Sequence, residues 1–239
     1  MNKYFIQKSS EQLEAFSYEL SDEKAVVTMQ KYFGCLNQSW GYVATYEYTV
    51  YPCGQIKVHL DAETVQNGKL EPEFLPRLGV VLKADQSLQN TMWLGRGNGE
   101  NYADTLAACP IGVYRRTDDG MGTNYVFPQE NGHREDVKWF SIGDEKNSML
   151  CTMEAPCGIN LSNYTDEMIE DAKHPWQLEK AEDVTLQIYY RQSGVGSNSC
   201  GEEQLEEYKV KRQDFVMAFT LQAVEAGEEV KAACKKYQD

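Results

Sequence analysis

Alternation of apolar and polar residues dominates the first quarter of the chain. Between Ala15 and Leu60, aromatic or β-branched residues recur at every second position, most clearly over residues 41–51. This period places alternate side chains on one face, so it predicts β-strands with one face buried. Polar and turn-forming residues interrupt the pattern at 22–24 and 52–54, which predicts two hairpins. The strands expected here cover residues 16–20, 26–32, 41–51 and 55–60.

The pattern of short strands and turn signals continues to residue 222. Further strands are predicted over residues 77–83, 91–95, 137–142, 149–154, 184–191 and 208–222. Only two segments favour a helix: 165–172, with Thr165 as N-cap and two acids in the first turn, and 225–237, rich in Ala, Glu and Lys. No repeat or low-complexity linker marks a boundary. The sequence therefore predicts one all-β domain, an antiparallel sandwich of two packed sheets with one or two short helices.

Composition narrows the function classes. The chain has 23 Lys and Arg against 37 Asp and Glu, a net charge of −14, and no basic patch, which excludes nucleic acid as a partner. No apolar run reaches the length of a signal-peptide core or a membrane span, so a soluble, cytoplasmic protein without a membrane partner is expected. Seven scattered cysteines without a CxxC pair predict free, mostly buried thiols rather than a disulfide framework or a zinc site.

Two runs combine Gly and Asn with aromatic residues and one Glu: WLGRGNGENYAD from Trp93 and YVFPQENGHR from Tyr125. Glu100 and Glu130 in these runs are candidates for an acid/base pair, because a retaining glycosidase needs two carboxyl groups about 5–5.5 Å apart. Each lies next to an Asn in a Gly-flanked turn, where a carboxylate most often accepts backbone N–H groups. We therefore expect Glu100 and Glu130, with Asn101 and Asn131, to hold their loops rather than to catalyse.

Other candidate side chains favour structural roles. His59 falls in a predicted strand and His174 precedes Pro175, while His133 follows Glu130 by three residues. A mutarotase-type reaction would need such a His acid and Glu base across a sugar ring, but this spacing alone is weak support. Most tryptophans are expected in the core, Trp93 and Trp139 among them, and Trp176 is the best candidate for exposure.

The run SGVGSNSCG, Ser193 to Gly201, is a glycine- and serine-rich loop. A phosphate-binding loop would need a following helix with Lys or Ser/Thr at set offsets, and these are missing. Cys200 is a poor nucleophile in this context, because the neighbouring Glu202 and Glu203 should raise the pKa of its thiol.

These three runs and LPRLGV, Leu75 to Val80, occur in an order that resembles the C-terminal domain, or separate small subunit, of the β-galactosidases of glycoside hydrolase family 2. The resemblance extends from Lys3 to Ala223. It implies a galactose mutarotase-like super-sandwich over residues 1–223, followed by a helical tail over 224–239. The family's domain has further strands before the matched part, so an N-terminally truncated domain is expected. Both catalytic glutamates of the family lie in a separate barrel, which implies a chain that is inactive alone.

The resemblance also implies sites and partners. The Ser193–Gly201 loop would reach the active site of a catalytic domain or large subunit, with Asn198, Ser199 and Cys200 near the galactoside. Cys200 stands where some members have a Trp, and a thiol lacks the aromatic face on which sugars pack. Carbonyls of Phe127 and Pro128 match a sodium site at the domain junction, and magnesium belongs to the catalytic domain. Unpaired strand edges favour self-association into a homo-oligomer.

Two alternatives stay open at this point. One is a stand-alone carbohydrate-binding module, since super-sandwich sheets often carry sugar sites. The other is a mutarotase-like isomerase that uses Glu130 and His133.

Overall fold

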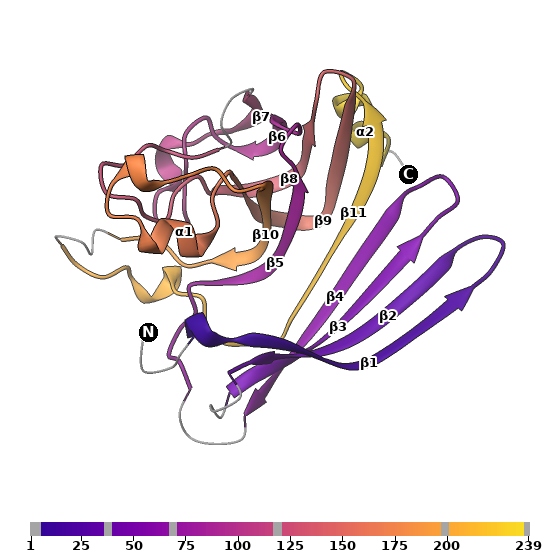
Figure 1. Cartoon of the computed structure of the whole chain (residues 1–239), viewed down its shortest axis with the longest axis horizontal. Helices are drawn as coiled ribbons and strands as arrows, with labels where there is room; N and C mark the ends of the chain where they lie inside the picture. Colours follow the sequence, from indigo (N-terminus) through magenta and orange to yellow (C-terminus); the bar gives the residue numbers. More distant parts are fainter. Residues whose placement is uncertain (1–5, 36–39, 67–70, 117–120, 197–200, 237–239) are drawn as a thin grey trace. The chain divides into compact units, whose positions relative to one another are not determined.

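The computed structural model describes residues 6–35, 40–66, 71–116, 121–196 and 201–236. The chain divides into two compact units. The first comprises Met1–Pro76 and Val210–Gln222, and the second comprises Arg77–Lys209 and Ala223–Asp239. Both are built mainly from antiparallel strands, which are labelled in Figure 1.

The first unit is a sheet with the strand order β1-β2-β3-β4-β11. Its strands are β1 (Ser10–Leu20), β2 (Ala25–Gly34), β3 (Trp40–Val50), β4 (Ile56–Gln66) and β11 (Phe215–Glu225), of which Phe215–Leu221 pairs with β4. The register aligns apolar residues across all five strands, because Phe16, Met29, Tyr46, Leu60 and Met217 lie in one cross-strand row. Such rows share a face, so alternation along each strand yields an apolar face.

The hairpins of the first unit lie where turn residues predicted them. Ser21 and Lys24 close the β1–β2 turn, with the Ser21 N–H donating to the Lys24 carbonyl at 3.0 Å. At the β3–β4 turn the Tyr51 N–H donates to the Gln55 carbonyl at 2.9 Å, and Gly54 has a φ of +82°. Only glycine adopts that conformation at little cost, which explains its place in the turn.

The second unit has the strand order β5-β10-β9-β8-β6-β7, and every pairing is antiparallel. Its strands are β5 (Arg77–Asp85), β6 (Asn90–Arg96), β7 (Ile111–Arg116), β8 (Arg134–Gly143), β9 (Asn147–Ser162) and β10 (Asp183–Gln192). Trp93 and Phe140 are register partners at its centre and are fully buried. Ile142 and Ile188 of the same unit are also fully buried.

Two short α-helices flank the strands of the second unit. α1 (Asp166–Asp171) begins as expected: the Thr165 hydroxyl accepts the Met168 N–H at 3.3 Å, with Asp166 and Glu167 in the first turn. α2 (Glu229–Lys236) buries Ala233 against Met92, Trp139 and Leu150. None of the helices in the described ranges is long and apolar enough to cross a membrane.

The all-β antiparallel class is confirmed, while several element boundaries were wrong. The strand expected over 208–222 begins only at Phe215, because Glu206–Tyr208 forms a 3₁₀ turn. The helix expected from Glu225 begins at Glu229, since Gly227 has a left-handed φ of +96°. The sequence pattern missed β7, and it ended β9 too early, before Pro156. Turn chemistry and ladder pairing decide such boundaries, and neither is visible in apolar periodicity.

The described cysteines and tryptophans largely follow expectation. Cys35, Cys109, Cys151 and Cys157 are buried thiols and Cys53 and Cys234 are exposed thiols, and none of these six is in a disulfide. Trp93 and Trp139 are buried, as predicted, and Trp176 is 78% exposed.

Candidate functional site

The runs that begin at Trp93 and Tyr125 lie against each other in the second unit. The Glu100 carboxylate accepts the Gly132 N–H at 2.9 Å and a hydrogen bond from the Tyr125 hydroxyl. Asn101 is fully buried: its N–H donates to the His133 carbonyl at 2.9 Å, and its side-chain oxygen accepts the Glu135 N–H at 2.8 Å. Glu100 and Asn101 therefore bind the second run through its backbone N–H and carbonyl groups.

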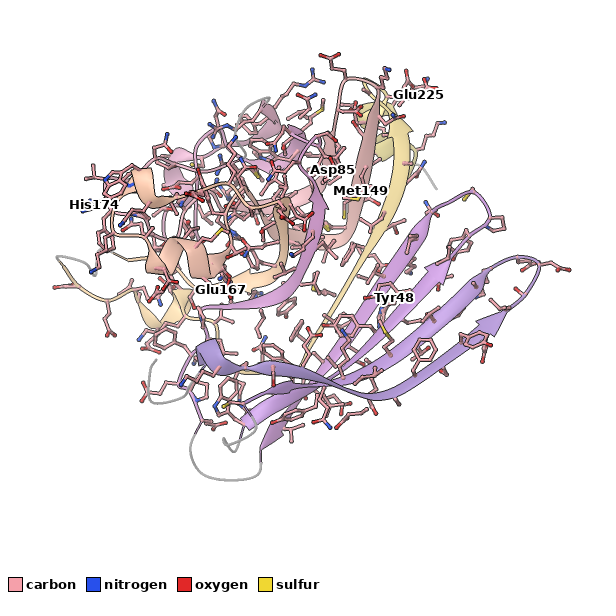
Figure 2. The ribbon with its side chains drawn as sticks, in the orientation of Figure 1. Tyr48, Asp85, Met149, Glu167, His174 and Glu225 are labelled. Carbon is pink, nitrogen blue, oxygen red and sulfur yellow. The ribbon has the colours of Figure 1, made fainter. Side chains whose placement is uncertain are left out.

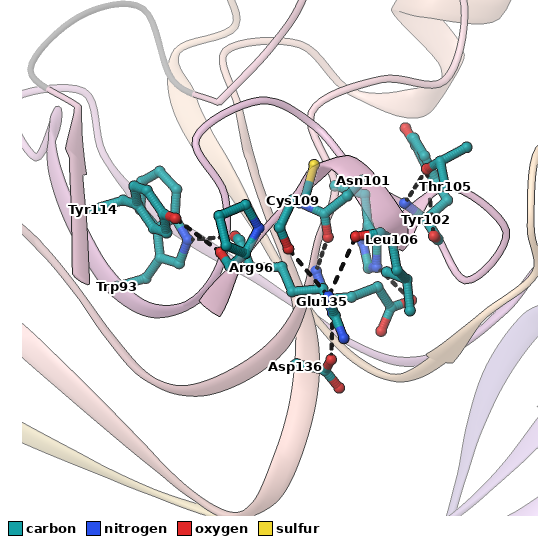
Figure 3. Close-up of polar contacts among 12 residues, drawn as sticks. Trp93, Arg96, Asn101, Tyr102, Thr105, Leu106, Cys109, Tyr114, Glu135 and Asp136 are labelled. Carbon is teal, nitrogen blue, oxygen red and sulfur yellow. Dashed lines mark hydrogen bonds and ion pairs between the residues drawn. The ribbon is translucent and has the colours of Figure 1, made fainter. Parts of the chain in front are cut away.

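An arginine fixes the base of the loop that contains Glu100. Arg96 donates from Nε to the Asp136 carboxylate at 2.6 Å and from Nη1 to the carbonyls of Leu106 at 3.3 Å and Cys109 at 3.1 Å, as Figure 3 shows. The Trp93 indole N–H donates to the Arg96 carbonyl at 2.9 Å. Because one guanidinium binds the Asp136 carboxylate and two carbonyls of the loop, it attaches the loop to β6.

Arg134 ends the second run and is fully buried. Its guanidinium donates to the carbonyls of Gly132 at 2.9 Å, His133 at 3.1 Å, Asn98 at 3.2 Å and Met121 at 3.4 Å. It also lies 5.3 Å from the centre of the Trp93 ring. Burial lowers the pKa of Arg134 to about 10. The group thus stays charged at neutral pH and joins both runs through backbone carbonyls.

Glu130 has a different partner from the one predicted. It accepts a charge-assisted hydrogen bond from Arg77 Nη1 at 2.9 Å rather than backbone N–H groups. Arg77 also pairs with Asp166 and donates to the Tyr189 hydroxyl at 3.3 Å. Burial lowers the pKa of Arg77, but Tyr189, Asp166 and Glu130 outweigh it and raise the pKa above its ordinary value. Glu130 still holds its loop, through a long-range ion pair that local turn chemistry could not reveal.

Asn131 bonds to the backbone on both sides of its own position. Its side-chain oxygen accepts the Thr123 N–H at 3.0 Å, and its amide donates to the Gln129 carbonyl at 2.7 Å. The Asn131 carbonyl in turn accepts the Asn160 side-chain amide at 2.8 Å. The YVFPQENGHR run is therefore closed on itself and attached to β9.

The geometry gives no support to catalysis by the candidate acids and bases. Glu100 is engaged by Gly132 and Tyr125, and Glu130 by Arg77. His133 is fully buried between the rings of Tyr102 and Tyr189, and its Nε2 lies 3.0 Å from Glu135 rather than pairing with Glu130. A mutarotase-like acid would have to reach a sugar, which a fully buried imidazole does not.

The remaining histidines lie apart from the loop cluster, which is formed by the two hydrogen-bonded runs Trp93–Asp104 and Tyr125–Arg134. His59 is in β4 of the first unit. His174 stacks on Trp176 with ring centres 5.8 Å apart, at the periphery of the second unit where Figure 2 labels it. Neither contributes to the loop cluster.

The third run joins the cluster through a residue that sequence reasoning missed. The Asp104 carboxylate accepts the N–H groups of Val195 and Gly196 at 3.2 and 2.6 Å. Asp104 is the last residue of the GENYAD motif, and this position is the sequence signal that could have identified it. Asn198, Ser199 and Cys200, expected near substrate, lie outside the described residues.

The residues expected at a sodium site lie on an exposed loop. Phe127 is 61% exposed, whereas Pro128 is buried and lines a cavity of about 220 Å³ together with Asn131 and Ile169. Carbonyl oxygens suit a hard cation, but two from one loop supply only part of an oxygen shell. Within the described ranges, no group of three or more His, Cys, Asp or Glu could hold a metal ion. The carbonyl oxygens of Phe127 and Pro128 are thus a suitable type of ligand for sodium, but they do not form a complete ligand set.

Comparison with known proteins identifies the family. The chain belongs to the beta galactosidase small chain family, whose model matches residues 3–221. It is 30% identical over 174 residues to the β-galactosidase of Actinobacillus pleuropneumoniae, covering 73% of this chain and 16% of that protein. It is 28% identical over 197 residues to the β-galactosidase of Kluyveromyces lactis, covering 82% and 19%. The chain thus spans less than a fifth of these relatives.

Among solved structures, the chain is similar to a galactose 1-epimerase from Lactobacillus acidophilus. The TM-score is 0.47 at 9% sequence identity, covering 88% of this chain and 66% of the epimerase.

Proposed function

We propose that this chain is the non-catalytic small-chain part of a β-galactosidase of glycoside hydrolase family 2, which hydrolyses terminal β-D-galactosides. It would pack on a catalytic barrel and shape the aglycone side of the active site through the Ser193–Gly201 loop. The observation that supports this most is that the carboxylates of Glu100 and Glu130 both hold loops in a chain that belongs to the small-chain family. The reacting carboxylates would then come from the partner.

Exposed apolar side chains supply a surface for that partner. Val126 is 87% exposed and neighbours Phe127 in the loop that carries the expected sodium ligands. Large exposed apolar side chains that lie together are typical of interaction sites. In the assembled enzyme, the Phe127 and Pro128 carbonyls would contribute to a sodium ion whose other ligands lie elsewhere, and magnesium would belong to the catalytic domain. None of the six described cysteines is in a disulfide, which favours the cytoplasm.

The test is hydrolysis of a chromogenic β-galactoside by the chain alone, by a β-galactosidase that lacks its own small-chain part, and by the mixture. We expect activity only in the mixture, with weaker association for Phe127→Ser. Val81→Ser is a matched control, because Val81 is 60% exposed but belongs to β5 and not to the Phe127 loop.

Activity in the chain alone would overturn the proposal and would make Glu100 and Glu130 the candidate catalytic carboxylates. An inactive mixture, with tight binding of an oligosaccharide to the chain alone, would instead favour a stand-alone carbohydrate-binding module.

A further inference from the structure

The Asp104 carboxylate accepts hydrogen bonds from the backbone at the start of the Ser193–Gly201 loop. One oxygen accepts the Val195 N–H at 3.2 Å, and the other accepts the Gly196 N–H at 2.6 Å. Hydrogen bonds to an ionised acceptor are about twice as strong as neutral ones. A single side chain thereby fixes two consecutive peptide units that are 91 and 92 residues away in sequence.

Local structure on both sides of this contact favours it. On the Asp104 side, the Thr105 hydroxyl accepts the Tyr102 N–H at 2.9 Å, and the Thr105 N–H donates to the Tyr102 carbonyl at 2.8 Å (Figure 3). On the loop side, a Cβ added at Gly194 would meet the Asp104 Cγ at 2.5 Å. Position 194 therefore accepts only glycine, because the Asp104 carboxylate occupies the space that a side chain would need.

Two further features hold the same peptide units in place. The Gly194 N–H donates to the Tyr208 carbonyl at 2.9 Å, which ties the loop start to the segment that follows the loop. Gly196 has a left-handed φ of +61°, so the chain turns at the residue bound most closely by Asp104. The carboxylate and this turn thus fix the backbone at Val195 and Gly196.

We propose that Asp104 is a positioning residue for the aglycone side of the β-galactosidase site. It acts through the Val195 and Gly196 N–H groups and fixes the backbone where the loop begins. The role rests on the proposed function, because it matters for catalysis only where the loop meets substrate in an assembled enzyme. Asp104 itself touches no reacting atom, so its removal should alter recognition of the leaving group rather than the chemical step.

The first measurement is amide hydrogen exchange in the chain alone. Asp104→Asn removes the charge and leaves one oxygen acceptor, so exchange at Val195 and Gly196 should accelerate about 10- to 100-fold. Asp214→Asn is a matched control, because Asp214 accepts the Thr64 N–H and hydroxyl at 2.7 and 2.8 Å in the first unit. Unchanged exchange at Val195 and Gly196 in Asp104→Asn would overturn the proposal.

The second measurement is the kinetics of the chain complexed with a β-galactosidase that lacks its small-chain part. Asp104→Asn should raise KM several-fold for a nitrophenyl galactoside, with less than a twofold change for methyl β-galactoside and in kcat. Gly194→Ala should produce the same pattern without a change of charge, because its Cβ displaces the carboxylate. An equal loss on both substrates would overturn the positioning role.

The two proposals fail in different ways. If the wild-type chain yields no activity with any such partner, the proposed function fails and the positioning role falls with it, even where exchange confirms the hydrogen bonds. If the wild-type chain complements but the Asp104 and Gly194 variants show no dependence on the aglycone, only the positioning role fails.

Discussion

The Glu100 carboxylate accepts the backbone N–H of Gly132 at 2.9 Å, and this bond joins two loops that lie 32 residues apart. Gly132 can present its N–H there because it has a left-handed φ of +85°. A Cβ at Gly132 would meet the Asn160 side-chain oxygen at 2.7 Å, so glycine is required for space as well as for conformation. The glycines and acids of the two motifs are thus parts of one contact.

Neutralising Glu100 should destabilise the second unit. In Glu100→Gln the hydrogen bonds from Gly132 and Tyr125 lose their charged acceptor, so we expect the free energy of unfolding to fall by about 1–2 kcal/mol. Urea unfolding followed by circular dichroism measures this. Glu179→Gln removes an exposed carboxylate from the same unit and should change stability by less than about 0.5 kcal/mol. Equal effects of the two substitutions would contradict the loop-holding role of Glu100.

Through its bond to Tyr125, the Glu100 carboxylate should make the free energy of unfolding fall at alkaline pH. The hydrogen bond to Glu100, with burial, raises the pKa of the Tyr125 phenol to about 12 from an ordinary value of 10. Because the folded-state pKa is raised, the stabilisation is fully present below pH 10 and is lost as the pH rises towards 12. Carbon-13 NMR of labelled tyrosine ring carbons should show one phenol whose pKa returns towards 10 in Glu100→Gln.

Tyr46 is the internal reference for that titration. Its pKa is also raised to about 12, but by burial first and by Glu11 next, within the first unit. The titration of Tyr46 should be unchanged in Glu100→Gln. A parallel shift of both phenols would point to general loosening of the fold instead of a local bond.

Local patterns in the sequence predicted the class of fold but only part of the loop cluster. Alternation located most strands, and turn chemistry assigned loop roles to Glu100, Asn101 and Asn131, each of which accepts a backbone N–H. The partner of Glu130 was missed, because Arg77 lies 53 residues away and no local rule pairs them.

Asp104 was missed for a similar reason. Its carboxylate binds N–H groups from a loop about 90 residues further along the chain. Contacts between distant segments depend on which strands pair and where their loops meet, and apolar periodicity within one segment does not show its distant neighbours.

Replacement of Arg134 tests whether a buried guanidinium unites the two runs. In Arg134→Lys a single ammonium cannot reach the four carbonyls that the guanidinium contacts, so buried acceptors are left unpaired. We expect a loss of about 3 kcal/mol. For a chain of this size that loss corresponds to a fall in Tm of about 6–12 °C, measurable by calorimetry.

Arg191→Lys is the control for that substitution. Arg191 is exposed and lies 5.6 Å from the Tyr190 ring, so its replacement should leave Tm within about 2 °C of the wild type. A Tm for Arg134→Lys as high as that of Arg191→Lys would show that the four carbonyl contacts contribute little.

Packing against His133 should make position 158 intolerant of any side chain. A Cβ at Gly158 would meet the His133 Cε1 at 2.3 Å, and the imidazole is held between Tyr102 and Tyr189. Overpacking of this kind costs about 1–3 kcal/mol, so Gly158→Ala should lower the free energy of unfolding by that amount. Gly99→Ala is the control, because a Cβ there has nothing within 4 Å.

A double-mutant cycle separates this clash from a change in strand propensity. His133→Ala removes the imidazole, so Gly158→Ala should cost much less in that background, giving a coupling energy of about 1 kcal/mol or more. If the alanine at 158 cost the same with and without the imidazole, the backbone of β9 would be the cause. The loss would then arise from the ladder, where Gly158 is the register partner of Tyr189, and His133 would be only a neighbour.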